Sequence, residues 1–119
     1  MNTPEGKVKD LVKRVLKTEN VWHYMPMQNG MGVVGIPDIV GCVPVTITED
    51  MVGKTIGVFI GVETKAKGKL NKTTPNQRNV LTQIHGSGGI AIVVETPLPV
   101  MEAVHRVKTE GDVAFYLPE

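Results

Sequence analysis

The stretch Gly57–Lys65, G-V-F-I-G-V-E-T-K, decides the predicted fold because an apolar run ends there in charged residues. The β-branched and aromatic side chains within Val58–Val62 predict a strand buried on both faces. Strand side chains alternate between faces, so Glu63 and Lys65 should lie on one side and Thr64 on the other. A carboxylate and an ammonium at such a strand end cost free energy unless they are paired, solvated or bound to an ion. The pair is therefore a candidate site, with a plain salt bridge at the strand end as the equal alternative.

Length and composition indicate an ordinary globular protein. The chain has 119 residues, which predicts one domain over residues 1–119 that buries about two-thirds of its unfolded surface. It lacks an apolar run long enough to cross a membrane and begins without the apolar core of a signal peptide, so we expect a cytoplasmic protein with no membrane partner. One cysteine, Cys42, excludes an internal disulfide and a multi-cysteine zinc site.

The charge is balanced overall but locally concentrated. Thirteen basic and twelve acidic residues leave a net charge of +1, which argues against a broadly basic nucleic-acid coat protein. Four lysines nevertheless crowd the segment at the end of the strand: Lys65, Lys67, Lys69 and Lys72. Such a patch suits a polyanion bound at one place, and a solvated lysine-rich loop is the simpler alternative.

The first helix is predicted from residue 4 to about residue 18. Thr3 can cap it, Pro4 suits its first position, and apolar residues recur at helical spacing. Those residues are Val8, Leu11, Val12, Val15 and Leu16. Glu5 precedes them by intervals that place it over this buried stripe. Glu5 either faces a site or serves only the helix dipole, and the sequence leaves both open.

A glycine-rich segment, Asn29–Gly35, matches G-x-G-x-x-G by letter. The dinucleotide fingerprint needs a helix that begins within the motif. Here Pro37 and β-branched residues follow, so we predict a loop and no dinucleotide site.

Two more strands are predicted before the central one. Val21–Met27 is a short aromatic strand, and Ile36–Val45 begins with an unusual carboxylate, Asp38. Residues 46–54 are polar enough to connect Ile36–Val45 to the stretch 57–65 as a hairpin. Antiparallel pairing of these two strands would bring Asp38 beside Glu63.

The second half of the chain predicts a parallel crossover. Thr74 caps a helix that starts at Pro75 and ends near Gly86, with Gln77 on its inward face. Ile90–Glu95 is the next buried strand, so residues 57–95 form a strand–loop–helix–strand unit that should be right-handed. A last helix from Pro99 and an edge strand over 113–117 follow. The predicted class is α/β, with a mixed central sheet flanked by helices in the order α-β-β-β-α-β, then helix and edge strand.

The polar residues of these elements suggest a divalent metal site. Asp38 and Glu63 converge at the end of the predicted sheet, with Lys65 two residues beyond and Glu5 and Gln77 on inward helical positions. Hard oxygen ligands suit Mg²⁺ or Mn²⁺, which can lower the pKa of a bound water. A neighbouring lysine can stabilise charge on phosphoryl oxygens or orient the attacking water.

These motifs resemble a known family. G-I-P-D at Gly35–Asp38, E-T-K at Glu63–Lys65 and Gln77 are similar to the PD-(D/E)xK nuclease superfamily, and specifically to the VRR-NUC domain in its stand-alone bacteriophage form. The resemblance covers nearly the whole chain. It implies a restriction-endonuclease-like core and, if the protein is viral, a location in the host-cell cytoplasm.

The resemblance also implies roles for individual residues. Asp38 and Glu63 would ligate the metal, and the Thr64 carbonyl would add a backbone oxygen. Lys65 would be the catalytic lysine, and Gln77 would position it or the water. The remaining implied roles are an outer-shell acid, Glu5, and DNA contacts by Lys67, Lys69, Lys72 and Arg78.

The function implied by the resemblance is a Mg²⁺- or Mn²⁺-dependent endonuclease, structure-selective for Holliday-junction or flap-like DNA and homodimeric. The alternatives are a non-catalytic nucleic-acid-binding module with a structural acid cluster, and a metal enzyme acting on a small phosphorylated metabolite. Cys42 lies inside an apolar strand without a nearby histidine in the sequence, which argues against a cysteine nucleophile.

Overall fold

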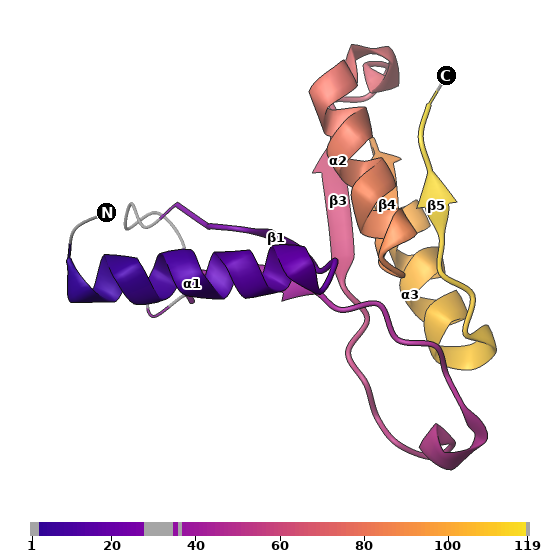
Figure 1. Cartoon of the computed structure of the whole chain (residues 1–119). Helices are drawn as coiled ribbons and strands as arrows, with labels where there is room; N and C mark the ends of the chain where they lie inside the picture. Colours follow the sequence, from indigo (N-terminus) through magenta and orange to yellow (C-terminus); the bar gives the residue numbers. More distant parts are fainter. Residues whose placement is uncertain (1–2, 28–34, 36, 119) are drawn as a thin grey trace. The chain divides into compact units, whose positions relative to one another are not determined.

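The computed structural model describes residues 3–27, 35 and 37–118, and the chain divides into two compact units, Met1–Val43 and Pro44–Glu119. The described residues form a mixed α/β structure with three α-helices and two small sheets, one antiparallel and one parallel (Figure 1). The single domain over residues 1–119 stays a prediction.

The first helix has well-defined ends. Helix α1 spans Pro4–Thr18, and the Thr3 side chain accepts a hydrogen bond of 2.9 Å from the N–H of Gly6. After the helix, Asn20 adopts a left-handed φ of 59°, and the N–H of Val21 donates to a carbonyl of the last turn at 2.9 Å. The predicted helix over residues 4–18 is confirmed. Within its own unit α1 keeps its apolar stripe exposed, because Val8, Leu11 and Val15 are 56–60% exposed. The predicted burial of this stripe stays a prediction.

The small antiparallel sheet of the first unit pairs β1 (Trp22–Tyr24) with β2 (Val40–Cys42). The Trp22 and Tyr24 rings lie 5.5 Å apart between centroids. At Gly41 a Cβ atom would come within 3.0 Å of the Trp22 carbonyl oxygen, so the close pairing of the strands needs a glycine there. Both strands are shorter than the ranges 21–27 and 36–45 that the sequence predicts.

These pairings correct the predicted hairpin. In the part of the chain that the structure describes, β2 is paired with β1 and not with the strand that contains Glu63. The mixed central sheet expected from the sequence is replaced by two separate small sheets. β2 pairs with β1 because the backbone N–H and C=O groups of Trp22–Tyr24 and Val40–Cys42 form hydrogen bonds with each other.

The second unit is built on a parallel sheet of three strands in the order β3-β4-β5 (Figure 1). Its strands are β3 (Ile60–Thr64), β4 (Ile90–Val94) and β5 (Phe115–Tyr116). Helix α2 (Pro75–Gly86) connects β3 to β4, which confirms the predicted parallel crossover. Helix α3 (Leu98–Glu110) connects β4 to β5, and β5 confirms the expected edge strand. Two short 3₁₀ segments, Glu49–Met51 and Leu70–Lys72, lie in the connections.

The core of this unit sits on β4, not on β3. Every residue of β4 is buried, whereas Ile60 and Val62 of β3 are 40% and 38% exposed. The prediction that the stretch 57–65 forms the central strand, buried on both faces, is therefore wrong. In the described sheet β3 has a neighbour on one side only, and β4 has neighbours on both sides.

The two helices cover opposite faces of the parallel sheet. Alternate β4 residues Ile90, Ile92 and Val94 pack with Ala103 of α3. On the other face, the buried Leu81 and Ile84 of α2 approach β3 at Gly61, where a Cβ atom would lie 2.8 Å from the Ile84 Cδ1 atom. A glycine at this position lets α2 come close enough to β3 for side chains of both elements to meet.

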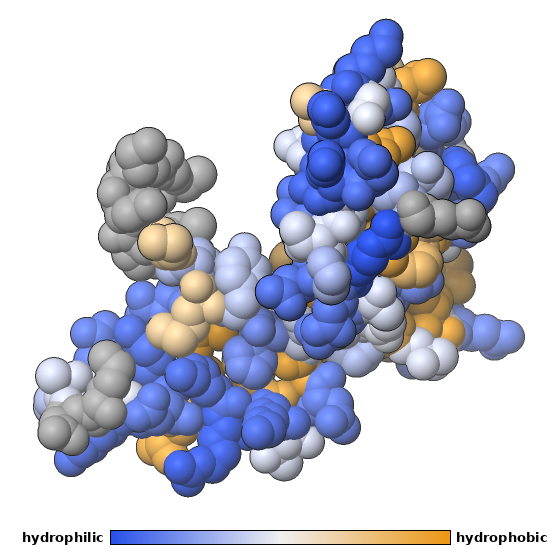
Figure 2. All heavy atoms as spheres, turned by 90° about the horizontal axis from the view of Figure 1, so that it is seen from above, coloured by the Kyte–Doolittle hydropathy of each residue, from blue (hydrophilic) through white to orange (hydrophobic). Residues whose placement is uncertain are grey.

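Apolar side chains also remain on the surface of both units (Figure 2). Among the helices of the described residues, none is both long and apolar enough to cross a membrane.

Candidate functional site

An ammonium and an amide meet where β3 ends and α2 begins. Lys65 Nζ donates a hydrogen bond of 2.9 Å to Gln77 Oε1. The backbone of Lys65 is held as well, because its N–H donates to the Val94 carbonyl at 2.9 Å and extends the β3–β4 ladder by one residue. The Lys65 side chain is only 15% exposed, and an ammonium this sheltered needs acceptors. The site lysine is thus fixed at both its backbone and its charged end.

The orientation of the Gln77 amide follows from its partners. Gln77 Oε1 also accepts from the N–H of Thr74 at 2.9 Å, and Thr74 Oγ1 accepts from the N–H of Gln77 at 3.1 Å, which forms a capping box. Lys65 Nζ and the Thr74 N–H are both donors, so the oxygen of the amide must face them. The amide nitrogen therefore has no partner within the described residues and can donate to a bound group.

The Glu63 carboxylate lies beside this lysine. Glu63 Oε2 is 3.7 Å from Lys65 Nζ, and the Glu63 side chain is 32% exposed. An ion pair at this distance and exposure contributes little to the stability of the fold. The stability of the pair alone is therefore not a sufficient reason for two charged residues at this position. Glu63 and Gln77 also line a groove of about 350 Å³ between β3 and α2. The expectations that Glu63 and Lys65 share a face and that Gln77 faces inward are confirmed as geometry, and their catalytic roles stay predictions.

Asp38 and Glu5 belong to the first unit. Asp38 is exposed in the bend that precedes β2, and Glu5 is exposed in the first turn of α1. Glu63 belongs to the second unit, so the convergence of these carboxylates with Glu63 stays a prediction. Most of the predicted glycine loop, residues 28–34, lies outside the described residues, but Gly35 has the positive φ of 82° that a turn requires.

The donor atoms of the second unit fit a hard divalent cation only as part of a larger set. Within residues 3–27, 35 and 37–118, no group of three or more histidine, cysteine, aspartate or glutamate side chains is arranged to hold a metal ion. Glu63 supplies one carboxylate, and Thr64 supplies a backbone carbonyl next to it. Mg²⁺ is commonly held by one or two protein carboxylates together with substrate phosphates, so Glu63 could supply one ligand of such an ion. A Mg²⁺ or Mn²⁺ site stays a prediction.

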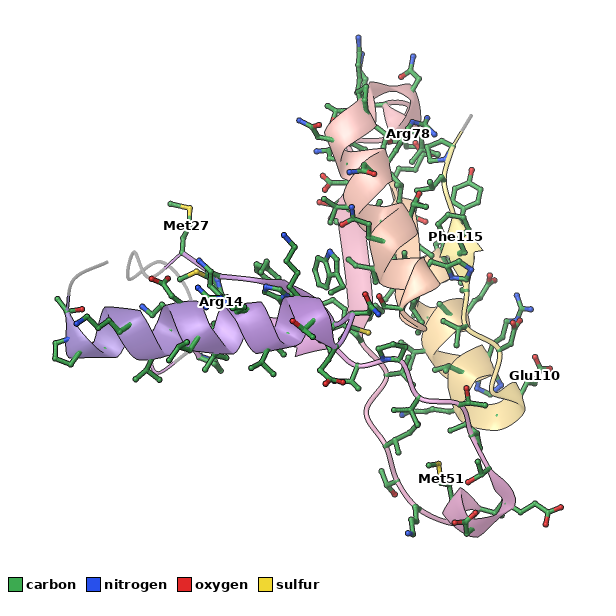
Figure 3. All side chains as sticks on the ribbon, viewed as in Figure 1. Arg14, Met27, Met51, Arg78, Glu110 and Phe115 are labelled. Carbon is green, nitrogen blue, oxygen red and sulfur yellow. The ribbon has the colours of Figure 1, made fainter. Side chains whose placement is uncertain are left out.

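The basic residues predicted to contact DNA lie in the loop that follows β3 and in the first turns of α2. Lys67, Lys69 and Lys72 are exposed in the loop between β3 and α2. Arg78, which is labelled in Figure 3, lies half-buried on α2. None of these four residues forms an ion pair with another residue that the structure describes. Their charges are therefore available to an external anion.

One contact at this end of the sheet was missed from the sequence. Glu95, the residue after β4, accepts a hydrogen bond of 2.5 Å from the N–H of Gly68 in the lysine-rich loop. The sequence does contain a signal for this contact. Glu95 directly follows an apolar strand, just as the polar residues Glu63–Lys65 follow the apolar part of β3. The carboxyl ends of parallel strands meet at one edge of a sheet, where sites are commonly built.

Cys42, His23 and His85 do not take part in the contacts of Lys65 and Gln77. Cys42 is 8% exposed, and burial raises the pKa of its thiol, which opposes a nucleophilic role. His85 stacks on Phe115 with 4.3 Å between ring centroids, and His23 Nδ1 lies 2.8 Å from the Val21 carbonyl oxygen. Both contacts are those of packing residues.

The chain matches no protein-family model, no curated protein and no solved structure.

Proposed function

We propose that this protein is a metal-dependent endonuclease that hydrolyses DNA phosphodiester bonds, with selectivity for Holliday-junction or flap-like DNA. The observation that carries the proposal is the placement of Lys65 at the carboxyl end of a parallel strand, 2.9 Å from Gln77 Oε1 and 3.7 Å from Glu63 Oε2. These three residues belong to the motif resemblance, and the fold of the second unit brings them together from two elements.

The proposal extends to the fold. The β3–α2–β4 crossover would form the half of a restriction-endonuclease-like core that carries E-T-K and the helical glutamine. The family resemblance further implies that Asp38 binds the same cation as Glu63.

The chemistry of the site follows from its donor atoms. Asp38, Glu63 and the Thr64 carbonyl would hold Mg²⁺ or Mn²⁺, with Glu5 as an outer-shell acid. When bound, such an ion supplies an acidified water and neutralises charge on the phosphate. Lys65 would stabilise the developing charge on the phosphoryl oxygens or orient the water, and Gln77 would keep the ammonium in place.

Substrate binding would use the basic residues around the site. Lys67, Lys69, Lys72 and Arg78 would neutralise backbone phosphates, so that binding weakens as salt rises. The family resemblance further suggests that two copies act as a homodimer, which suits a branched substrate with two arms to cleave.

To test this function, the purified protein is incubated with labelled junction, flap and duplex DNA in the presence of Mg²⁺, Mn²⁺ or EDTA, and the cleavage products are measured. We expect product with either metal and none in EDTA, and no product from Asp38→Asn or Lys65→Ala. Lys108→Ala, an exposed lysine of α3, is the matched control and should cleave like the wild type. Unchanged cleavage by folded Asp38→Asn would remove the proposal. Salt-sensitive DNA binding without product in any metal would instead support the non-catalytic binding module.

A further inference from the structure

The lysine-rich loop after β3 has a defined backbone conformation. The N–H of Lys69 donates to the Ala66 carbonyl at 2.9 Å, and Gly68 between them has a φ of 81°. A hydrogen-bonded turn with a positive φ at its third residue is a type II turn, which favours glycine at that position. A 3₁₀ turn, in which the Lys72 N–H donates to the Lys69 carbonyl at 2.9 Å, continues from it. The lysines are thus presented from ordered turns.

One tertiary hydrogen bond ties this turn to the core. The N–H of Gly68 donates to Glu95 Oε2 at 2.5 Å across 27 positions of sequence. Glu95 is half-buried and directly follows β4, the most buried strand of the unit. A hydrogen bond to an ionised carboxylate is stronger than one between neutral groups. The exposed loop is therefore anchored to the residue that directly follows the most buried strand of the unit.

The charge of Glu95 is unfavourable for the function of this loop. A carboxylate beside Lys67 and Lys69 lowers the local positive potential, and a lower potential weakens the binding of a polyanion. Glu95 also forms no ion pair with those lysines within the described residues, so it is not there to neutralise them. The contact that the structure gives to Glu95 is the backbone N–H of Gly68.

We propose that Glu95 is a positioning residue that holds the Ala66–Lys69 turn in the conformation in which Lys67 and Lys69 bind the phosphates of the substrate. This role rests on the proposed function, because it names the residue that orders the substrate-binding loop of the same site. It predicts that the hydrogen bond of Glu95 matters more to substrate binding than its charge does.

Two substitutions separate the effect of the Glu95 charge from the effect of its hydrogen bond to the Gly68 N–H. Glu95→Gln and Glu95→Ala remove the same negative charge, but only glutamine keeps an oxygen that can accept from the Gly68 N–H. We expect Glu95→Gln to bind junction DNA at least as tightly as the wild type. Glu95→Ala should bind about threefold to tenfold more weakly than Glu95→Gln. Fluorescence anisotropy in EDTA, over a range of salt concentrations, measures both affinities without cleavage.

A second measurement reports the turn without DNA. Trypsin cleaves after lysines in mobile segments, so cleavage after Lys67 and Lys69, followed by mass spectrometry, should be faster in Glu95→Ala than in Glu95→Gln and the wild type. Cleavage after Lys108 is the internal reference. Thermal unfolding checks that both variants are folded.

The outcomes are distinguishable. Equal DNA affinity and equal loop cleavage in Glu95→Ala and Glu95→Gln, with a wild type that binds DNA, overturn the positioning role alone. A wild type that binds no DNA overturns the proposed function, and with it the phosphate-binding role of the turn. Weaker binding and faster loop cleavage confined to Glu95→Ala support the positioning role.

Discussion

Gln77 Oε1 accepts hydrogen bonds from both Lys65 Nζ and the N–H of Thr74, each at 2.9 Å. The atom that closes the first turn of α2 is therefore also the atom that holds the site lysine. The start of the helix and the orientation of the ammonium are coupled through a single oxygen, and this coupling can be tested.

Removing the Gln77 side chain should damage activity more than stability. Gln77→Ala frees the Lys65 ammonium, and misplacement of a positioned group by about 1 Å can reduce the rate about 100-fold. Thr74→Ala is the matched control, because it removes the cap acceptor of the same box at a cost of about 1 kcal/mol and leaves Gln77 Oε1 beside Lys65. We expect junction cleavage to fall strongly in Gln77→Ala and little in Thr74→Ala, with unfolding in urea measured for both. Equal losses of activity would show that the amide acts only as a helix cap.

A methyl group at Gly61 should push α2 away from β3. The added Cβ would lie 2.8 Å from Ile84 Cδ1, and such overpacking typically costs about 1–3 kcal/mol. Ile84→Val deletes that Cδ1 atom, so Gly61→Ala should cost less in the Ile84→Val background than alone. Urea unfolding of the two single variants and the double variant gives the coupling free energy, which we expect to exceed about 0.5 kcal/mol. Strictly additive costs would mean that α2 does not approach β3 at this point.

The position of the core predicts a ranking of three valine-to-alanine substitutions. Val93 of β4 is 1% exposed, Val62 of β3 is 38% exposed and Val52 is 79% exposed. Val93→Ala should cost about 2 kcal/mol or more, because it removes fully buried methyl groups and leaves a cavity. Val62→Ala should cost less, and Val52→Ala should stay within about 0.5 kcal/mol. Chemical unfolding of the three variants checks the order, and a larger loss for Val62 than for Val93 would contradict the placement of the core on β4.

Cys42 should make stability fall at alkaline pH. Burial raises the pKa of its thiol above the ordinary value of 9.0, so the unfolded chain releases the proton at a lower pH than the folded chain does. Below the unfolded pKa both states are protonated and the contribution to stability is complete. As pH rises through the folded pKa this contribution is lost.

Comparison with Cys42→Ala isolates this effect from the titration of lysines and tyrosines. The free energy of unfolding of the wild type minus that of Cys42→Ala should be constant from pH 6 to about pH 8 and should decrease at pH 10. Urea unfolding at each pH measures it. A difference that grows with pH would mean that the folded state favours the thiolate.

Much of the second unit was predictable because its signals are local. Thr74, Pro75 and Gly86 mark the ends of α2 within a few residues of sequence, and the alternation of a strand places Glu63 and Lys65 on one face. Gln77 was predicted to face inward from the helical period alone. Its partner, Lys65, follows from the short crossover that brings the start of α2 back to the end of β3.

The errors concern which elements become neighbours. The apolar stretch around Ile60 suggested a central strand, yet β4 takes the centre because it has a paired strand on each side and a helix on each face. The hairpin expected for β2 gave way to pairing with β1. The position of Glu95 directly after an apolar strand marked the residue, but its partner is a backbone N–H of a loop residue 27 positions away, which no side-chain pattern identifies.

The amino-acid sequence by itself determined the caps of the helices, the faces of the strand residues and the chemistry available at the end of β3, since each depends on groups a few bonds or one helical turn apart. Tertiary structure alone decided which strand is buried on both faces, that Gly61 admits Ile84, and that Glu95 holds the turn at Gly68. Those outcomes depend on which distant surfaces exclude water together, and that competition is settled only when the whole unit packs.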